Sequence, residues 1–206
     1  MKNYILMVVS IVSLNVFAQK NEPVEQVSDK DWQMELLYTY DPLNTSYGDN
    51  YGFIFKAKRF KYQGDHIKLL YGLAYQNSYI SETENLFTDH VDGFTRDIGL
   101  YAIFDLVYYP FARKKFYISF EPFAGVTHLK SIGKLRIQEH SVYETYVNNF
   151  AYFNYGVTQS LGFKIKDFTI SGFGWLSLKG FLDGGRMRPA DFDSRLFVGV
   201  GVGYAF

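Results

Sequence analysis

The sequence predicts an all-β protein, an antiparallel up-and-down β-barrel of about eight strands. Three observations lead to this fold class. Bulky apolar residues alternate with small or polar residues along most of the chain, short and long connections between these stretches take turns, and the last stretch ends on an aromatic residue. A period of two is the mark of a strand with two different faces.

The final stretch, residues 194–206, shows this alternation most clearly. Its bulky apolar residues share one parity: Leu196, Val198, Val200, Val202, Tyr204 and Phe206. After Phe197, the other parity is almost bare: Gly199, Gly201, Gly203 and Ala205. A strand at a chain end leaves an edge that needs a partner. We therefore expect the last strand to close the barrel against the first, which starts near Trp32.

Seven earlier stretches are predicted to be strands. They are residues 32–40, 51–58, 67–76, 98–109, 116–127, 153–165 and 168–179. One parity is apolar in the first six, whereas both faces of 168–179 are mixed and its parity stays open. Pro122 lies inside a strand although proline cannot donate a ladder hydrogen bond, so we expect a bulge or a local break in pairing there.

The connections between these stretches alternate in length. The tight turns are residues 62–65, 110–114 and 166–167, and the long connections are 41–50, 81–96, 131–149 and 180–193. Short and long connections therefore lie at opposite ends of the strands, and both chain termini are expected at the short-turn end. This arrangement is typical of membrane barrels, whose turns are short on one side and whose loops are long on the other.

Composition narrows the class of protein. Aromatic residues make up 19% of the chain, and the mean hydropathy is −0.12. This combination is expected where only alternate residues face lipid and aromatic girdles meet the membrane interface. Lys+Arg and Asp+Glu are both 21, so no excess charge points to a nucleic-acid partner. The absence of cysteine excludes disulfides and thiolate metal sites.

The first residues predict a secretory signal peptide. Lys2 gives a positive start, residues 4–14 are mostly apolar, and Val16 and Ala18 take the positions before cleavage. We expect cleavage after Ala18, followed by a flexible periplasmic lead-in over residues 19–30. The alternative is an uncleaved anchor, but the apolar run is short for a spanning helix of about 20 residues.

Taken together, the signal peptide, the alternating strands and the ending at residues 200–206 resemble bacterial outer-membrane β-barrel proteins of the small OmpA/OmpX type. The resemblance implies a transmembrane antiparallel up-and-down barrel over residues 31–206, a monomer surrounded by outer-membrane lipid. It also implies a structural or surface-interaction role carried by four long external loops. By the same resemblance, Gly201, Tyr204 and Phe206 match the terminal signal that the barrel-assembly machinery reads.

Two other classes of barrel are alternatives. A soluble lipocalin-like barrel would turn its apolar face inward, but the second face here is small and mildly polar, whereas a water-facing surface carries more charge. A narrow small-solute channel is the other alternative within the membrane class.

A lipid-modifying outer-membrane hydrolase would need a hydroxyl nucleophile, a His base and a carboxylate. The candidates are His128 with Ser131, and His140, Ser141 and Glu144 in the following connection. Their spacing does not match the family pattern for lipid A deacylation. We therefore expect no enzyme activity and no catalytic residues.

Metal and cofactor sites are not expected. The loop groups that could gather a cation are Asp89, His90 and Asp92, and Asp183, Asp191 and Asp193. Their spacing is not that of a dedicated calcium site, and loop carboxylates are usually solvated. The four histidines also lack the paired spacing of a zinc site.

Six charged residues take the inward parity and predict a plugged lumen: Glu35, Lys56, Lys58, Lys68, Asp105 and Glu121. An unpaired buried charge would cost several kcal/mol, so the lysines and carboxylates are expected to pair. Tyr101, Phe123 and Phe197 share this parity and add bulk. An interior of about eight strands is narrow enough for such side chains to fill.

Basic residues near the tight turns and aromatic residues of the long connections suggest two surfaces. Basic residues flank the tight turns and are expected to meet anionic phospholipid headgroups: Lys58, Arg59, Lys61, Arg113, Lys114, Lys115, Lys164 and Lys166. Aromatic residues of the long connections are candidates for contact with a surface partner: Phe87, Phe94, Tyr143, Tyr146 and Phe181.

Overall fold

The computed structural model describes residues 31–42, 50–84, 90–137, 142–178 and 196–206. The predicted signal peptide, residues 1–18, and the predicted lead-in, residues 19–30, lie outside the described residues. Phe87, Asp89, His140, Ser141, Phe181, Asp183, Asp191 and Asp193 lie outside them too.

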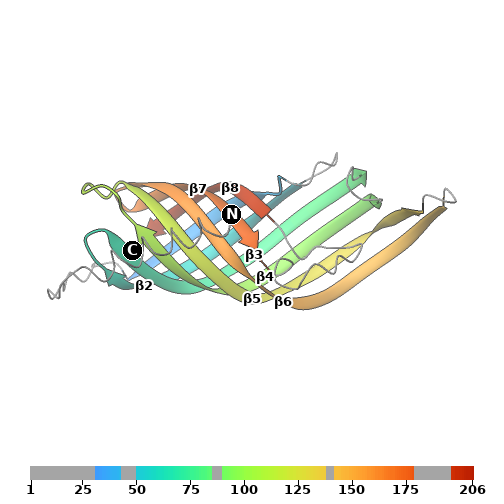
Figure 1. Ribbon diagram of the computed structural model, residues 1–206, viewed down its shortest axis with the longest axis horizontal. Coiled ribbons are helices and arrows are strands. Elements are labelled where there is room, and N and C mark those ends of the chain that lie inside the picture. The colour runs from blue at the N-terminus through green and yellow to red at the C-terminus, as the bar shows by residue number, and fades with distance from the viewer. Residues whose placement is uncertain (1–30, 43–49, 85–89, 138–141, 179–195) are drawn as a thin grey trace, which may run out of the picture.

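The described residues form eight antiparallel strands that close into a barrel, which confirms the predicted fold class (Figure 1). Each strand pairs with its neighbours in the sequence, so the topology is up-and-down. The strands are β1 (Trp32–Tyr40), β2 (Asn50–Gln63), β3 (Ile67–Glu84), β4 (His90–Tyr108), β5 (Phe116–Ile137), β6 (Val142–Ile165), β7 (Phe168–Ser177) and β8 (Leu196–Ala205).

The barrel closes between β8 and β1, as the terminal alternation predicts. Gln33 is opposite Ala205 and Tyr40 is opposite Val198. Beyond the strand ends, the Trp32 amide donates to the Phe206 carbonyl at 3.1 Å, and the Phe206 amide donates to the Trp32 carbonyl at 2.9 Å. The edges of the first and last strands are thereby satisfied by each other.

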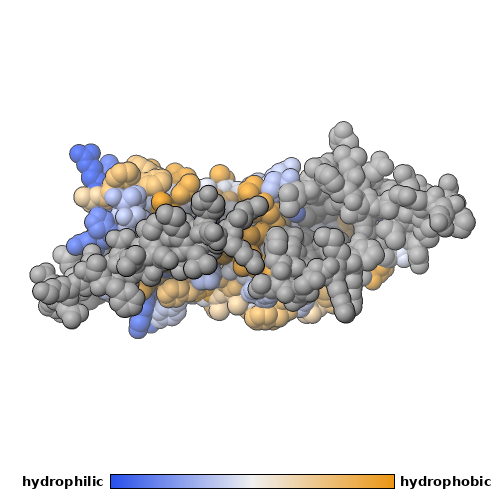
Figure 2. Space-filling view, viewed as in Figure 1, coloured by the Kyte–Doolittle hydropathy of each residue, from blue (hydrophilic) through white to orange (hydrophobic). Residues whose placement is uncertain are grey.

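The outer surface is apolar and graded along the barrel axis. Aliphatic residues such as Leu36, Leu73 and Leu100 are exposed at mid-height, and exposed aromatic rings such as Trp32 and Tyr38 border them on either side. In Figure 2, hydrophobic residues cover the middle of the barrel, and strongly hydrophilic residues gather at its left end. This is the apolar band with aromatic girdles of a membrane barrel.

The lengths of the strands divide the barrel into two sides. β1, β7 and β8 have 9 or 10 residues, about the number that crosses a bilayer at a tilt. β3 to β6 have between 18 and 24 residues and extend as two hairpins beyond the other strands (Figure 1).

The expectation that residues 81–96 and 131–149 are loops is therefore wrong, because most of both segments is strand. Phe94 lies in β4, where its half-buried ring stacks on Tyr79 with centroids 6.1 Å apart. Tyr143 and Tyr146 belong to β6, opposite Arg136 and Gly133 of β5.

Pro122 causes a local break in pairing without a bulge. The ladder between β4 and β5 has no paired residues at 104–105 and 121–122, and the register is the same on both sides of this gap. The missing N–H of proline accounts for the gap, as expected.

No helix among the described residues is long and apolar enough to cross a membrane.

Candidate functional site

The barrel interior gathers most of the predicted site residues. Because successive side chains of a strand point to opposite faces, the parity opposite the apolar one lies inside. Lys56, Lys58, Asp105 and Glu121 are each 2% exposed. Glu35, on β1, is partly buried beside them.

Lys58 is the centre of a charge cluster, defined as Glu35, Lys56, Lys58, Asp105 and Glu121. Its Nζ lies 2.6 Å from Glu35 Oε1, 2.6 Å from Asp105 Oδ2 and 3.4 Å from Glu121 Oε2. Lys58 therefore links β1, β4 and β5 to its own strand β2 through one ammonium group.

Lys56 completes the charge cluster by binding Glu121 Oε1 at 2.5 Å. Glu121 thus accepts from both lysines, one on each carboxylate oxygen. The cluster places three carboxylates against two ammonium groups. In a dry interior, removing one partner of such a pair leaves an uncompensated charge, which is far more costly than the pair is stabilising.

Lys68, the sixth predicted lumen charge, lies apart from the charge cluster and nearer the short-turn end. Its Nζ is 5.1 Å from the ring centroid of Phe60 and 5.6 Å from that of Tyr109. These distances are those of cation–π contacts. A small apolar group next to it, Leu70, Val107, Tyr109 and Tyr117, packs across β3, β4 and β5.

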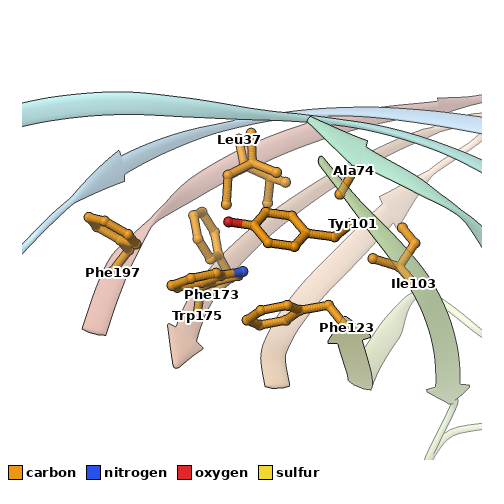
Figure 3. Packing of buried hydrophobic residues seen from close by; sticks show 9 residues of the cluster. Leu37, Ala74, Tyr101, Ile103, Phe123, Phe173, Trp175 and Phe197 are labelled. Atoms are coloured by element: carbon orange, nitrogen blue, oxygen red, sulfur yellow. The ribbon is translucent and has the colours of Figure 1, made fainter. Parts of the chain in front are cut away.

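An aromatic cluster fills the lumen above the charge cluster. Figure 3 shows the labelled rings of Tyr101, Phe123, Phe173 and Trp175 pointing toward one another, from β4, β5 and β7. Phe123 stacks on Trp175 with centroids 4.5 Å apart and 11° between the planes, and Tyr101 meets Phe123 edge-on at 5.1 Å. The cluster also includes Leu37, Ile54, Ala74, Ile103 and Phe197.

Inward-facing glycines give the large rings their space. A Cβ built on Gly99 would overlap the ring of Tyr101, and one built on Gly162 would overlap the ring of Tyr117. The small inward-facing residues therefore leave room for a few bulky inward-facing side chains. Together, the small and the bulky residues fit the narrow interior.

A chain of neutral hydrogen bonds crosses the lumen on five strands, and sequence reasoning missed it. Ser177 donates to Asn154 Oδ1 at 2.6 Å, and Asn154 donates to Thr127 at 3.0 Å. The Thr127 and Tyr101 hydroxyls are 2.7 Å apart, and Tyr101 donates to Gln76 Oε1 at 2.9 Å.

Gln76 in turn donates to Ser78 at 3.0 Å, which ends this hydrogen-bond chain. Because Tyr101 gives its only proton to Gln76, Thr127 must be the donor between the two hydroxyls, so all five bonds run in one direction. The available signal was parity: all six residues take the inward parity of their strands, although that of β7 was left open.

Of the hydrolase candidates, His128 and Ser131 have described side chains, and these two do not come together. His128 is exposed on the outer face of β5, whereas Ser131 is fully buried on the inner face, with its hydroxyl 3.0 Å from that of Thr95. Residues three apart in a strand point to opposite faces. For Glu144 the structure places the backbone in β6, opposite Leu135.

Within the described residues, no group of three or more His, Cys, Asp or Glu side chains is arranged to hold a metal ion. His90 belongs to β4, and Asp92 lies at the irregularity between Val91 and Phe94.

The three predicted assembly residues lie along β8 and its end. Gly201 is opposite Leu37 of β1, and Tyr204 is opposite Met34. The rings of Tyr204 and Phe206 are exposed on the outer face, stacked with centroids 6.2 Å apart. A Cβ on Gly201 would press against the side chain of Leu37.

Comparisons with known proteins give only distant similarity. No family model matches the chain, and no curated protein matches its sequence. Among solved structures, Ail, the attachment invasion locus protein of Yersinia pestis, is 14% identical with a TM-score of 0.47, covering 87% of this chain and 100% of that one. Neisserial surface protein A is 12% identical with a TM-score of 0.45, covering 87% and 98%.

The N-terminal β-barrel domain of Pseudomonas aeruginosa OprF is 9% identical with a TM-score of 0.42, and the match covers 86% of this chain and 98% of that domain. The closed barrel of this chain is established by its own strand pairing.

Proposed function

We propose that this chain is an integral outer-membrane barrel whose role is contact at the cell surface, carried by the end opposite the short turns. The observation behind the proposal is the extension of β3–β4 and β5–β6 as two hairpins beyond the apolar band. A strand that only crosses a bilayer needs about 9–11 residues, so the additional length has to serve outside the membrane.

The upper border of the apolar band supports this reading. Asn77, Arg96 and His128 face outward on neighbouring strands, and Arg96 donates to Asn77 at 3.3 Å. Above them, Lys130 and Lys134 of β5 are exposed on the outer face. Ionised groups are costly against lipid and normal in water, so the hairpins stand in solvent.

The extended part of β6 offers apolar contact area in that solvent. Val147 is 63% exposed and Phe150 is 44% exposed, although both lie above the band. Exposed aromatic and aliphatic groups rimmed by polar residues are the usual composition of a protein contact site. A surface partner of the hairpins is therefore favoured over a purely structural role.

Topology can be tested with single cysteines, because the native chain has none. Lys134→Cys lies on the β5–β6 hairpin, and Lys61→Cys is its matched control near the short turns; both native lysines are exposed. A membrane-impermeant maleimide applied to intact cells is expected to label Lys134→Cys and to reach Lys61→Cys only after lysis. The reverse pattern would place the hairpins in the periplasm and refute the proposal.

Partner binding is tested by cross-linking through the same labelled position. Capture from intact cells is expected to depend on the extended part of β6, so that Val147→Ser with Phe150→Ser, one substitution on each face of the strand, abolishes it while the barrel still folds. Unchanged capture would show that the partner does not contact these two side chains of β6.

Export and assembly belong to the same proposal. Cleavage after Ala18 is supported by the signal-like start, and mass spectrometry of the purified protein should give Gln19 as the first residue.

Deleting Phe206 removes both backbone hydrogen bonds to Trp32 and an exposed ring of the terminal strand. We expect a lower yield of folded barrel with export intact, measured as the heat-modifiable fraction on gels; Phe206→Tyr is the control that keeps an aromatic end.

A further inference from the structure

The short-turn end of the barrel contains a strongly basic pocket of about 290 Å³. The described residues that line it are Gln63, Lys68, Tyr109, Arg113, Lys114, Lys115, Lys164 and Lys166. Six of these eight carry a positive charge and none is a carboxylate. The six positive charges are therefore concentrated in one concave site and are not dispersed around the rim of the barrel.

Three tight turns build this basic pocket. They follow β2, β4 and β6, and all bring cations or polar groups to the same mouth of the lumen. Lys114 also donates to the Gly64 carbonyl at 3.4 Å, which ties the second turn to the first. The hydrophilic end seen at the left of Figure 2 is this end of the barrel.

The basic residues that the sequence analysis grouped around the tight turns fall into two kinds, those that line the pocket and those that do not. Lys58 points into the charge cluster, and Arg59 and Lys61 are exposed outside the pocket. Asp65 and Asp167 lie in the same turns without lining it. The local surplus of positive charge is therefore confined to the lining residues.

Two features distinguish the pocket from a random grouping of surface lysines. Lys68 is 8% exposed and projects from inside the barrel, where weak screening strengthens its attraction for an anion. Lys114 and Lys166 have φ values of 49° and 54°, in the left-handed region that favours Gly or Asn. Both turns thus carry a lysine where the backbone alone would favour an uncharged residue.

We propose that this pocket binds a phosphate-bearing anion. Several oxygens on one centre can accept from several ammonium groups at once, and Arg113 offers a planar pair of donors. Gln63 Oε1 is buried without a hydrogen-bond partner among the described atoms, so it can accept a hydrogen bond from the O–H group of a hydrogenphosphate. The phosphate comes either from a phospholipid headgroup or from a phosphorylated solute. The proposal is independent of the surface role.

The first experiment titrates the full barrel, in zwitterionic phosphatidylcholine vesicles, with inorganic pyrophosphate. The readout is the thermal unfolding midpoint, compared with sodium chloride at equal ionic strength because general screening affects every exposed charge. A saturable rise with pyrophosphate alone is expected.

The pocket variant is Lys115→Gln with Lys166→Asn, since Asn is tolerated at the left-handed position. Its matched control, Arg59→Gln with Lys61→Gln, removes the same charge from the same end outside the pocket. The pocket variant is expected to weaken pyrophosphate binding about tenfold or more, and the control to leave it unchanged. If the pocket variant does not fold, Arg113→Gln with Lys114→Asn tests the same site.

The second arm distinguishes the two sources of phosphate. Adding phosphatidylglycerol to the vesicles should stabilise the barrel and compete with pyrophosphate if the lipid headgroup occupies the pocket. Undiminished pyrophosphate binding in these vesicles identifies a soluble phosphate. No saturable response to pyrophosphate or to phosphatidylglycerol, or an equal loss in the pocket variant and the control, would overturn the proposal.

Discussion

The charge cluster and the hydrogen-bond chain cross the same lumen with different chemistry. In the charge cluster, Lys58 alone contacts three carboxylates on three other strands. In the chain from Ser177 to Ser78, one neutral hydrogen bond joins each residue to the next.

This difference determines how each layer responds to damage. Removing one member of the charge cluster leaves buried charges without compensation, and their desolvation is not recovered. Removing one member of the neutral chain costs about the value of one hydrogen bond, because the remaining groups are uncharged and can adjust. Substitutions in the charge cluster are thus expected to lower the free energy of unfolding more than substitutions in the hydrogen-bond chain.

The largest expected effect is on Lys58. Lys58→Met keeps the length of the side chain and leaves Glu35, Asp105 and Glu121 facing one another, so the free energy of unfolding should fall by about 3–5 kcal/mol. Urea unfolding of the barrel in lipid vesicles, followed by tryptophan fluorescence, measures the change. Lys61→Met, at an exposed position on the same strand, is the control; an equal loss in both would remove the charge cluster from the explanation.

A smaller loss is expected where a glycine makes room for the aromatic cluster. Gly99→Ala would force the ring of Tyr101 to move, at a cost of about 1–3 kcal/mol for overpacking. Gly174→Ala is matched to it, because a Cβ built there meets no heavy atom within 4 Å. Equal unfolding free energies for the two variants would show that the lumen is less tightly filled than the structure indicates.

The neutral chain itself should be less sensitive still. Tyr101→Phe keeps the ring and removes the hydroxyl that joins Thr127 to Gln76, so the unfolding free energy should fall by about 1 kcal/mol. Tyr75→Phe, on the outer face of the barrel, is the control. A loss as large as that of Lys58→Met would contradict the ranking of the two layers.

The smallest signal is expected from the unmodified barrel itself, in its ionic conductance. Both layers span the lumen, so planar-bilayer recordings should show no large, steady currents. Glu121→Ala, a substitution in the charge cluster and so of large expected effect, leaves Lys56 without its carboxylate and is expected to destabilise the barrel or make it leak. Steady channels from the unmodified protein would show that the layers do not form a plug.

β7 shows where sequence reasoning about a single strand stops. Its parity could not be read because the usual contrast is inverted: Phe173 and Trp175 are buried inside, while Gly172 and Gly174 take outward positions. The aromatic cluster needs bulk from this strand, and outward glycines meet only lipid or solvent. The two extended hairpins were missed for a related reason, since above the apolar band the outer face carries polar residues such as Lys130 and Lys134 and the apolar-out signal disappears.

The sequence by itself determined the strand alternation, the even strand count, the two kinds of connection and the inward direction of the six lumen charges. These follow from a local period of two, which every strand except β7 displays without reference to its neighbours. Only the tertiary structure decided that Lys58 meets Asp105, that Lys68 stands apart, and that six cations converge on one pocket. Such contacts join residues distant in the chain, and they depend on the diameter and stagger of the closed barrel, which no single strand encodes.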